Sequence, residues 1–427
     1  MGRQHELSRR AFLGRASAAL GFPYILSAST LGAAPSDRIT MGIIGYGKQC
    51  RGHLGAMLGR REVQVLAVCD VQALRLGQAK ARVDERYAAA RARGAYRGCL
   101  ATGDFRHVVA RQDIQAALIA TPDHWHAIPS IHACQAGKDV YCEKPLSLTL
   151  REARAMVDAA RRYRRVFQTG SQQRSWNNFR FACEMVRSGR IGRVHTVHVN
   201  VGGPSRPCHL PGQPLRQGVD WDMWLGPAPW RPYHETICPP LTYRGWPQWR
   251  RFRDYSGGGM TDIGAHHFDI AQWGLGTDHT GPVEIVPPGH GDAPWLTYRY
   301  AHGVVMHHGG SPRSSIAFLG TEGKVFVGRG HLSTEPPELM HTPIQPGEVH
   351  LTRSDNHHAN WLAAIRARSR PVADVEIGAR SVSVCHLGNL AYGLRRPLRW
   401  DPQREVFPRD AEANRGLDRA RRAPWRL

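Results

Sequence analysis

The feature that most constrains the fold is a glycine turn between a strand-like and a helix-like pattern near the start of the chain. Residues 38–44 are apolar and rich in isoleucine, and the turn Gly45-Tyr46-Gly47 follows them directly. Glycines permit a tight turn and a close approach of the backbone to a pyrophosphate, which a helix amino terminus then stabilises. The pattern predicts a dinucleotide-binding site, although Cys50 stands where this fingerprint usually has glycine or alanine.

A carboxylate after the next strand supports this prediction. Residues 63–69 form a second β-rich run that ends at Asp70, about 20 residues after the turn. A carboxylate there can accept hydrogen bonds from both ribose hydroxyls and repels a 2′-phosphate, so it favours NAD over NADP. Arg75 lies close enough in sequence to leave NADP open.

Strands and helices alternate through this region. The further expected elements are strands at 116–120, 139–142 and 166–169 and helices at 72–90 and 125–136. This alternation predicts a Rossmann domain, a doubly wound parallel sheet with helices on both faces. Ligands of such sheets bind beyond the carboxyl ends of the strands, where this chain carries two unusual polar segments, TPDHWH at 121–126 and EKP at 143–145.

The pattern changes in the second half of the chain. Short strands are expected at 195–201, 283–286, 295–300, 304–308, 315–319 and 324–327. They predict a C-terminal α+β domain with an open, mostly antiparallel sheet, whose free face a homo-oligomer, a dimer or tetramer, would cover. A helix at 356–368 is expected to return to the first domain, and we assign no role to its His357 and His358.

A long segment at 202–250 is rich in proline, tryptophan and arginine and has little periodicity. Two interpretations stay open. The segment could wall a carbohydrate site, because aromatic rings stack on sugar faces and arginine and aspartate bind hydroxyls. It could equally be an ordered insertion that packs only against itself.

The first 34 residues have the three parts of a twin-arginine (Tat) signal peptide. They are the pair Arg9-Arg10 within SRRAFL, an apolar run at 16–30, and small residues at 32–34. We therefore expect a Tat-exported, periplasmic protein that begins near Pro35, with an NAD-binding domain at 35–165 and a substrate and oligomerisation domain at 166–427. No later apolar run approaches the roughly 18 residues that span a bilayer, so no membrane contact is expected after signal removal.

The charge is strongly positive, with 57 basic and 35 acidic residues. Such an excess suits a polyanion, but no nucleic-acid-binding motif accompanies it, so we expect no nucleic-acid partner. Only five of the basic residues are lysines, and a lysine inside a motif is therefore not expected to serve as generic surface charge. The nine cysteines are scattered, odd in number and lack a CxxC pair, which argues against a disulfide framework and a structural zinc site.

The EKP segment places a carboxylate and an ammonium group at a strand end. Lys144 could hydrogen-bond the reacting hydroxyl beside a nicotinamide and stabilise its alkoxide character. A cis bond before Pro145 would aim the lysine into the cleft. The alternative is a surface pair of Glu143 and Lys144.

A second group of polar residues lies on a helix expected at 262–273. Residues four apart share a face, so Asp262 and His266 are neighbours, whereas His267 lies on another face and is expected to pack. His266 suits a general base because its usual pKa is near neutrality, and Asp262 could orient it or bind a substrate hydroxyl. Asp269 completes a set that could bind a metal, but histidine pairs recur elsewhere and no third cluster has metal spacing, so we expect no metal.

These motifs together resemble one family. GIIGYG, CD, ATPDHWHA, CEKPLS, GSQQR, DWDMWLGP and GGGMTDIGAHHFD occur in the order of the Gfo/Idh/MocA oxidoreductases, and the resemblance spans most of the mature chain. It is greatest to the Tat-exported bacterial branch with a C-terminal extension. The resemblance implies the second-domain sheet and a site in which Asp262 and His266 meet Lys144 at the substrate. We expect these three to be catalytic, and the cofactor to be bound by Gly45, Tyr46, Gly47, Asp70, Thr121, Pro122, His126, Glu143 and Lys144.

Three functions are compatible with these residues. The first is an exported NAD-dependent oxidoreductase that acts on a hydroxyl of a sugar, glycoside or cyclitol. The second follows because NAD is not freely recycled outside the cytoplasm: a redox-neutral glycosidase or glycoside lyase that oxidises, eliminates, adds water and reduces again. The third is a sugar-binding protein that has kept the fold without turnover.

Overall fold

Six parallel strands form the first sheet, in the order β3-β2-β1-β4-β5-β6. Their bounds are β1 Ile39–Ile44, β2 Val63–Cys69, β3 Leu100–Thr102, β4 Ala116–Ile119, β5 Asp139–Cys142 and β6 Phe167–Thr169. Ile44 pairs with Cys69 on one side and with Ile119 on the other, so these strands end level. The predicted doubly wound parallel sheet is confirmed; only β3 lay outside the expectation.

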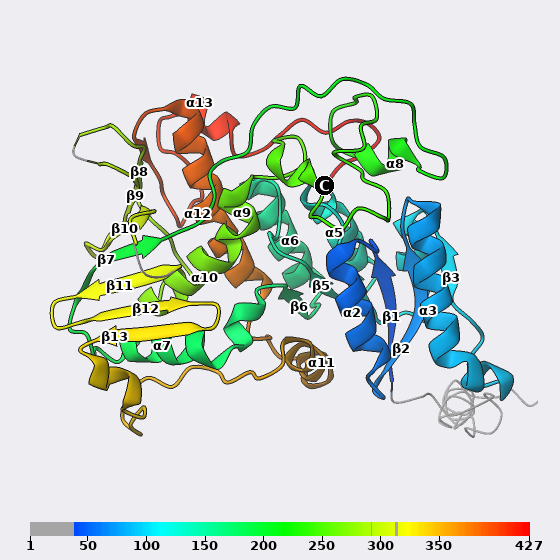
Figure 1. Ribbon diagram of the computed structural model, residues 1–427, viewed down its shortest axis with the longest axis horizontal. Helices are drawn as coiled ribbons and strands as arrows, with labels where there is room; N and C mark the ends of the chain where they lie inside the picture. Colours follow the sequence, from blue (N-terminus) through cyan, green and yellow to red (C-terminus); the bar gives the residue numbers. More distant parts are fainter. Residues whose placement is uncertain (1–37, 292, 312–314) are drawn as a thin grey trace, which may run out of the picture. The chain divides into compact units, whose positions relative to one another are not determined.

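The computed structural model describes residues 38–291, 293–311 and 315–427 (Figure 1). The predicted signal peptide at 1–34 lies outside these residues. Within them, no helix combines the length and apolarity needed to cross a membrane.

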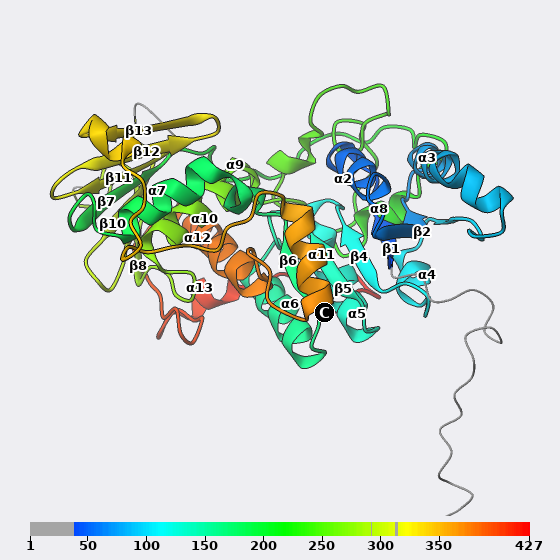
Figure 2. The same cartoon turned by 90° about the horizontal axis from the view of Figure 1, so that it is seen from below.

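Helices cover both faces of the first sheet (Figures 1 and 2). One face is covered by α2 Lys48–Leu58, α3 Ala73–Ala92 and α11 His357–Ala367, and the other by α4 Phe105–Val109, α5 Ala127–Gln135 and α6 Leu150–Arg162. The fully buried Trp361 of α11 packs on Tyr141 of β5, with ring centroids 5.5 Å apart. The expected return of the 356–368 helix to the first domain is thereby confirmed.

The second sheet has eight strands in the order β13-β12-β11-β7-β10-β9-β8-β14, antiparallel except for the β7–β10 pair. They are β7 Val194–Val199, β8 Glu284–Val286, β9 Leu296–Arg299, β10 Val305–His308, β11 Ile316–Gly320, β12 Lys324–Gly328, β13 His331–Glu335 and β14 Leu398–Arg399. Helices α7 Asn177–Arg187, α10 Gly264–Leu275 and α12 Val375–Leu394 share its hydrophobic core. The open, mostly antiparallel sheet is confirmed.

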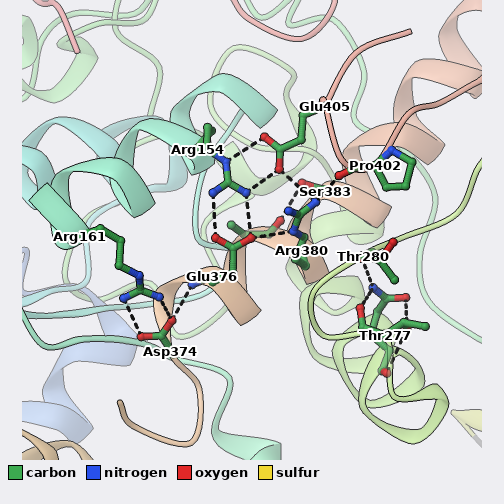
Figure 3. Close-up of polar contacts among 12 residues, drawn as sticks. Arg154, Arg161, Thr277, Thr280, Asp374, Glu376, Arg380, Ser383, Pro402 and Glu405 are labelled. Carbon is green, nitrogen blue, oxygen red and sulfur yellow. Dashed lines mark hydrogen bonds and ion pairs between the residues drawn. The ribbon is translucent and has the colours of Figure 1, made fainter. Parts of the chain in front are cut away.

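Ion pairs join α6, which covers the first sheet, to α12, which packs on the second sheet. Figure 3 shows Arg154 between Glu376 and Glu405, with Nη1–Oε2 and Nη2–Oε1 distances of 2.8 and 2.6 Å. Arg380 binds the same two carboxylates, and Arg161 pairs with Asp374, the N-cap residue of α12. Bidentate arginine–carboxylate contacts fix geometry as well as energy, so this network sets how α12 lies on α6.

The segment 202–250 carries α8 Trp221–Leu225 and leads into the short helix η3 Gln248–Arg251. It has an aromatic core of its own, in which Trp221 stacks on Trp224 at 4.9 Å. The end of the chain reaches it after α13 Ala411–Arg415. Arg422 binds Gly226 and Asp222, and Trp425 packs edge-on against Trp125 at 4.7 Å. The C-terminal extension therefore joins the insertion to the first domain.

The expected single helix at 262–273 is wrong in one respect: it is broken at Ile263. Helix α9 covers Gly259–Asp262, and α10 starts at Gly264. The His266 amide bonds the Ile263 carbonyl three residues back, a tighter turn than an α-helix has. Asp262 thus ends one helix, and His266 lies in the first turn of the next.

A buried ion pair holds α10 in place. Arg174, in the 3₁₀ turn η2 Gln172–Ser175 that follows β6, contacts Asp269 at 2.8 Å and Asp278 at 2.7 Å. Ser381 of α12 donates to the same Asp269 carboxylate at 2.7 Å. Arg174 is 1% exposed and Asp269 is fully buried. Three elements therefore meet at one carboxylate.

Removal of the Arg174 guanidinium should leave Asp269 charged and unpaired in the interior. We expect Arg174→Ala to lower the free energy of unfolding by about 3–5 kcal/mol. Urea denaturation followed by tryptophan fluorescence measures this. Arg353→Ala, which removes an exposed pair with Asp355, is the control and should change it by less than about 1 kcal/mol. Equal effects of the two substitutions would contradict the assignment.

Candidate active site

One cavity lies beyond the carboxyl ends of the first sheet's strands and extends to α10. Its wall includes Gly45, Gly47 and Asp70 at one end and Lys144, Asp262 and His266 at the other. Thr121, Pro122 and Glu143 also line it, as do residues of the 202–250 insertion. The structure thus brings together most of the predicted site residues, from both domains.

The glycine turn opens the cavity to the start of α2. Gly45 has φ +85°, and a Cβ there would lie 2.9 Å from the carbonyl of Ala120, so no larger residue fits between β1 and β4. At Gly47, the N-cap of α2, a Cβ would meet nothing within 4 Å, and no side chain caps the helix. The first amides of α2 therefore face open space, the arrangement that binds a pyrophosphate.

Asp70 is held by its own loop. One carboxylate oxygen accepts from the Tyr46 amide at 2.7 Å and the other from the Gln72 amide at 2.8 Å. Burial raises the pKa of Asp70, and the nearby Arg75 guanidinium opposes that rise. The remaining lone pairs of the Asp70 carboxylate can accept hydrogen bonds from ribose hydroxyls. Arg75 also lines the cavity and is a cation that could favour a 2′-phosphate. The predicted cofactor residue Tyr46 contributes its amide, while its side chain is buried.

The segment 202–250, hereafter the insertion, forms a roof over the cavity, that is, it covers the end that contains Asp70. Gln72 donates to the Cys238 sulfur at 3.1 Å and accepts from Arg216 at 3.0 Å. Across the groove, Lys48 donates to the Arg244 carbonyl at 2.7 Å and lies 4.7 Å from the Trp246 ring centroid. The interpretation that 202–250 packs only against itself is wrong, because the segment bonds both sides of the nucleotide end.

His126 joins the two polar loops from behind the cavity. Its Nδ1 lies 2.7 Å from the Pro145 carbonyl and its Nε2 lies 2.9 Å from the Thr121 carbonyl. Burial works against charge on the ring, but Cys142, Asp123 and the Pro145 carbonyl outweigh it and raise the pKa of His126 to about 10. Two acceptors require two N–H donors, so the ring is an imidazolium. His126 was predicted to bind the cofactor; in the structure it joins the loop at 121–126 to the loop at 143–145.

The Lys144 ammonium group reaches across to the second domain. The Lys144–Pro145 bond is cis, and Nζ donates to the Asp262 carbonyl at 2.7 Å and to its carboxylate at 2.9 Å. Arg250 Nε lies 3.6 Å from the same carboxylate. Burial raises the pKa of Asp262, but these two cations outweigh it and hold the pKa below its usual value. Asp262 is therefore ionised and fixes the lysine in the cavity wall.

His266 is a neutral imidazole beside these charges. It is 1% exposed, and its buried Nδ1 has no hydrogen-bond partner among the described residues. Burial, followed by Lys144 and Arg329, holds the pKa of His266 well below its usual value. The ring lines the cavity, and a neutral imidazole there can accept a proton from a ligand. His267 faces away and contacts the Asn200 carbonyl at 3.1 Å, as expected of a packing residue.

The set considered for a metal is not brought together. Asp269 pairs with Arg174, and Asp262 with Lys144. Over the described ranges, no group of three or more histidine, cysteine, aspartate or glutamate side chains has an arrangement that could hold a metal ion. All nine cysteines lie in those ranges and are free thiols.

Sequence reasoning missed a carboxylate–histidine chain behind Lys144. Glu143 accepts from His53 of α2 at 2.8 Å, and the other His53 nitrogen lies 2.8 Å from His358 of α11. Burial raises the pKa of Glu143, but His53 and Lys144 outweigh it and lower that pKa. No spacing rule links residues so far apart, and neither histidine lies in a motif.

It also missed three polar residues of the cavity wall, Gln172, Arg250 and Arg329. Gln172 lies within the GSQQR motif, to which the sequence alone assigns no role. Arg250 and Arg329 could not be singled out, because arginine is so frequent in this chain that its presence does not mark a site.

Sequence models of protein families match both halves of the chain. Residues 39–171 match "Oxidoreductase family, NAD-binding Rossmann fold", and residues 205–427 match "Oxidoreductase family, C-terminal alpha/beta domain". The second match alone covers more than half of the chain.

Individual proteins are more distant. The chain is 26% identical over 300 residues to a 1,5-anhydro-D-fructose reductase of Ensifer adhaerens, across 65% of this chain and 77% of the relative. It is 27% identical over 298 residues to a glycosyl hydrolase family 109 protein of Stenotrophomonas maltophilia, across 64% and 63%. The matches to six other curated relatives span 24–47% of their length.

Solved structures share the fold. The WlbA dehydrogenase of Bordetella pertussis, solved with NADH and UDP-GlcNAcA, superposes with a TM-score of 0.57 at 18% identity, over 85% of this chain and 99% of that one. At this identity the likeness concerns the fold alone.

The Asp70 geometry predicts the nucleotide preference. Asp70→Asn should weaken NADH binding by about tenfold to a hundredfold, because the charged acceptor for the ribose hydroxyls is lost, and should narrow the preference over NADPH. Fluorescence titration of nucleotide-free protein with each nucleotide measures both effects. Asp158→Asn, on the exposed side of α6, is the control. A wild-type protein that binds NADPH as tightly as NADH would contradict the assignment.

The buried neutral histidines predict acid lability. Burial lowers the pKa of His267, His357 and His386 to about 4 and that of His124 to about 3. Their stabilising effect is complete above the unfolded pKa near 6.5 and is lost as pH falls toward the folded values. Asp123, with a pKa of about 6, gains a proton in the same interval and opposes the fall with one group against four. The urea midpoint should therefore fall between pH 7 and pH 5, and His386→Gln should reduce the slope. An unchanged midpoint over this interval would show that these rings are not buried neutral.

Proposed function

Because the chain belongs to the Gfo/Idh/MocA oxidoreductase family, with an NAD-binding Rossmann domain, we propose that it oxidises a hydroxyl group of a sugar, glycoside or cyclitol with NAD. One observation carries this proposal: a single cavity has a pyrophosphate cradle and Asp70 at one end and Lys144, Asp262 and His266 at the other. The relative named as a 1,5-anhydro-D-fructose reductase supports a sugar-like substrate.

Gly45, Gly47 and Asp70 would hold the nucleotide, which would supply the acceptor for a hydride from the carbon that bears the hydroxyl. The Lys144 ammonium, oriented by Asp262, donates a hydrogen bond to the hydroxyl oxygen and stabilises its growing negative charge. The neutral His266 ring, which lines the cavity, accepts the hydroxyl proton. The C–H and O–H bonds break, the C=O bond forms, and the charges on the protein change only at His266.

A second candidate is a redox-neutral glycosidase or glycoside lyase. The glycosyl hydrolase family 109 relative supports it. So does the insertion, because its contacts with Gln72 and Lys48 would help to retain a nucleotide bound beside them. A retained cofactor serves a cycle that oxidises one hydroxyl, eliminates the glycosidic bond, adds water and returns the hydride.

Export and assembly are part of the proposal. The twin-arginine pattern at 8–13 supports Tat export to the periplasm, which would also favour capture of the nucleotide before translocation. The outer face of the second sheet carries Trp295, His198 and His307 in mutual contact. A second copy of the chain could cover this face in a dimer or tetramer.

Product analysis separates the candidates. We expect the purified protein to carry NAD, detected by mass spectrometry after denaturation, and to act on glycosides or polyols. NADH accumulation with a stoichiometric ketone identifies the dehydrogenase, whereas sugar release without NADH identifies the redox-neutral cycle.

Lys144→Ala and His266→Ala should each lower kcat by about a hundredfold or more, because each removes a group that acts on the reacting hydroxyl. Arg353→Ala is the control. If the wild-type protein binds sugar but shows no turnover, it is a sugar-binding protein and not an enzyme.

A further inference from the structure

We propose that the substrate of this site is an acidic sugar whose carboxylate is bound by Arg329 and Arg250. The inference rests on the proposed function and deepens it, because it names the chemical class of substrate at the same cavity. Both arginines line the cavity at the end that holds Lys144, Asp262 and His266.

Arg329 comes from the turn between β12 and β13, at the end of that hairpin nearest α10 (Figure 1). It is exposed and makes no hydrogen bond or ion pair with the described residues, yet its charge acts on His266. Exposed arginines without a side-chain partner among the described residues occur elsewhere, for example Arg97 and Arg409, but only Arg329 of these three lines the cavity. A cation that faces a cavity without a protein partner is available to a ligand anion.

Arg250 is held against the wall by aromatic rings. Its guanidinium carbon lies 4.3 Å from the Trp249 centroid and 4.8 Å from the Trp246 centroid. The two rings restrict the guanidinium, whose fork of N–H donors can bind a carboxylate through both oxygens. Trp249 lines the cavity as well and can stack on a sugar ring.

The cations at this end of the cavity differ in what binds them. The Asp262 carboxylate binds Lys144 at 2.9 Å and lies 3.6 Å from Arg250, whereas no carboxylate of the described residues binds Arg329. Asp123 and Glu143 lie in the same wall, and Glu143 contacts His53 at 2.8 Å. A neutral sugar would leave Arg329 without an anionic partner, whereas a substrate carboxylate would bind it and leave Lys144 for the reacting oxygen.

Paired sugars test the inference. Isothermal titration calorimetry on the protein as purified should show D-glucuronate or D-galacturonate binding at least about tenfold more tightly than D-glucose or D-galactose, and the preference should weaken as salt rises. Glucose 6-sulfate tests whether a sulfate ester is bound instead.

Arg329→Gln should remove most of the preference, with little effect on the neutral sugars. Lys324→Gln is the matched control, because it removes one positive charge from the same hairpin, where Lys324 pairs with Glu335 at 2.7 Å. Equal affinity for acidic and neutral sugars, binding of neither, preference for the sulfate alone, or an unchanged preference in Arg329→Gln would overturn the inference. The proposed function fails separately, if the protein neither carries NAD nor turns over any sugar.

Discussion

The buried pair of Arg174 and Asp269 is the interaction on which the site depends. Arg174 follows β6 of the first sheet, Asp269 lies on α10, and Ser381 of α12 bonds the same carboxylate. Burial of a charged pair is costly unless its geometry and hydrogen bonds are nearly complete, and here both side chains are well bonded. The pair therefore sets the distance between the first domain and the helix that carries His266, and it does so three residues from that histidine.

Lys144 is positioned by both domains: the first domain fixes the backbone beside it, and the second domain binds its ammonium group. The Pro145 carbonyl is fixed by His126, and the Lys144 ammonium is fixed by Asp262 at the end of α9. The break at Ile263 lets Asp262 and His266 approach the lysine from different helices. In a single straight helix, Asp262 and His266 would lie one turn apart on the same face. The break at Ile263 places them on different helices.

Much of the fold and part of the site follow from local sequence patterns. The glycine turn, Asp70 and Lys144 were predictable because each depends on backbone geometry at a strand end, which neighbouring residues determine. The break at Ile263 was not, since it depends on packing of α9 and α10 in a core built from distant segments. Arg329 and His358 were missed for a related reason: their chemistry arises from residues far away in the chain, and arginine and histidine are too frequent here to mark them.

The C-terminal extension and the insertion connect the substrate end to the nucleotide end through aromatic contacts. Arg422 holds α8 by the carbonyl of Gly226, and the Trp224 carbonyl of α8 accepts from both His124 and Trp125 of the 121–126 loop. A Cβ at Gly226 would overlap the Trp125 ring, so α8 lies directly on that loop. Because the same insertion also provides the roof beside Asp70 and the Trp249 wall beside Lys144, a change in its position alters both ends of the cavity together. We therefore expect nucleotide binding and substrate recognition to be coupled in this chain.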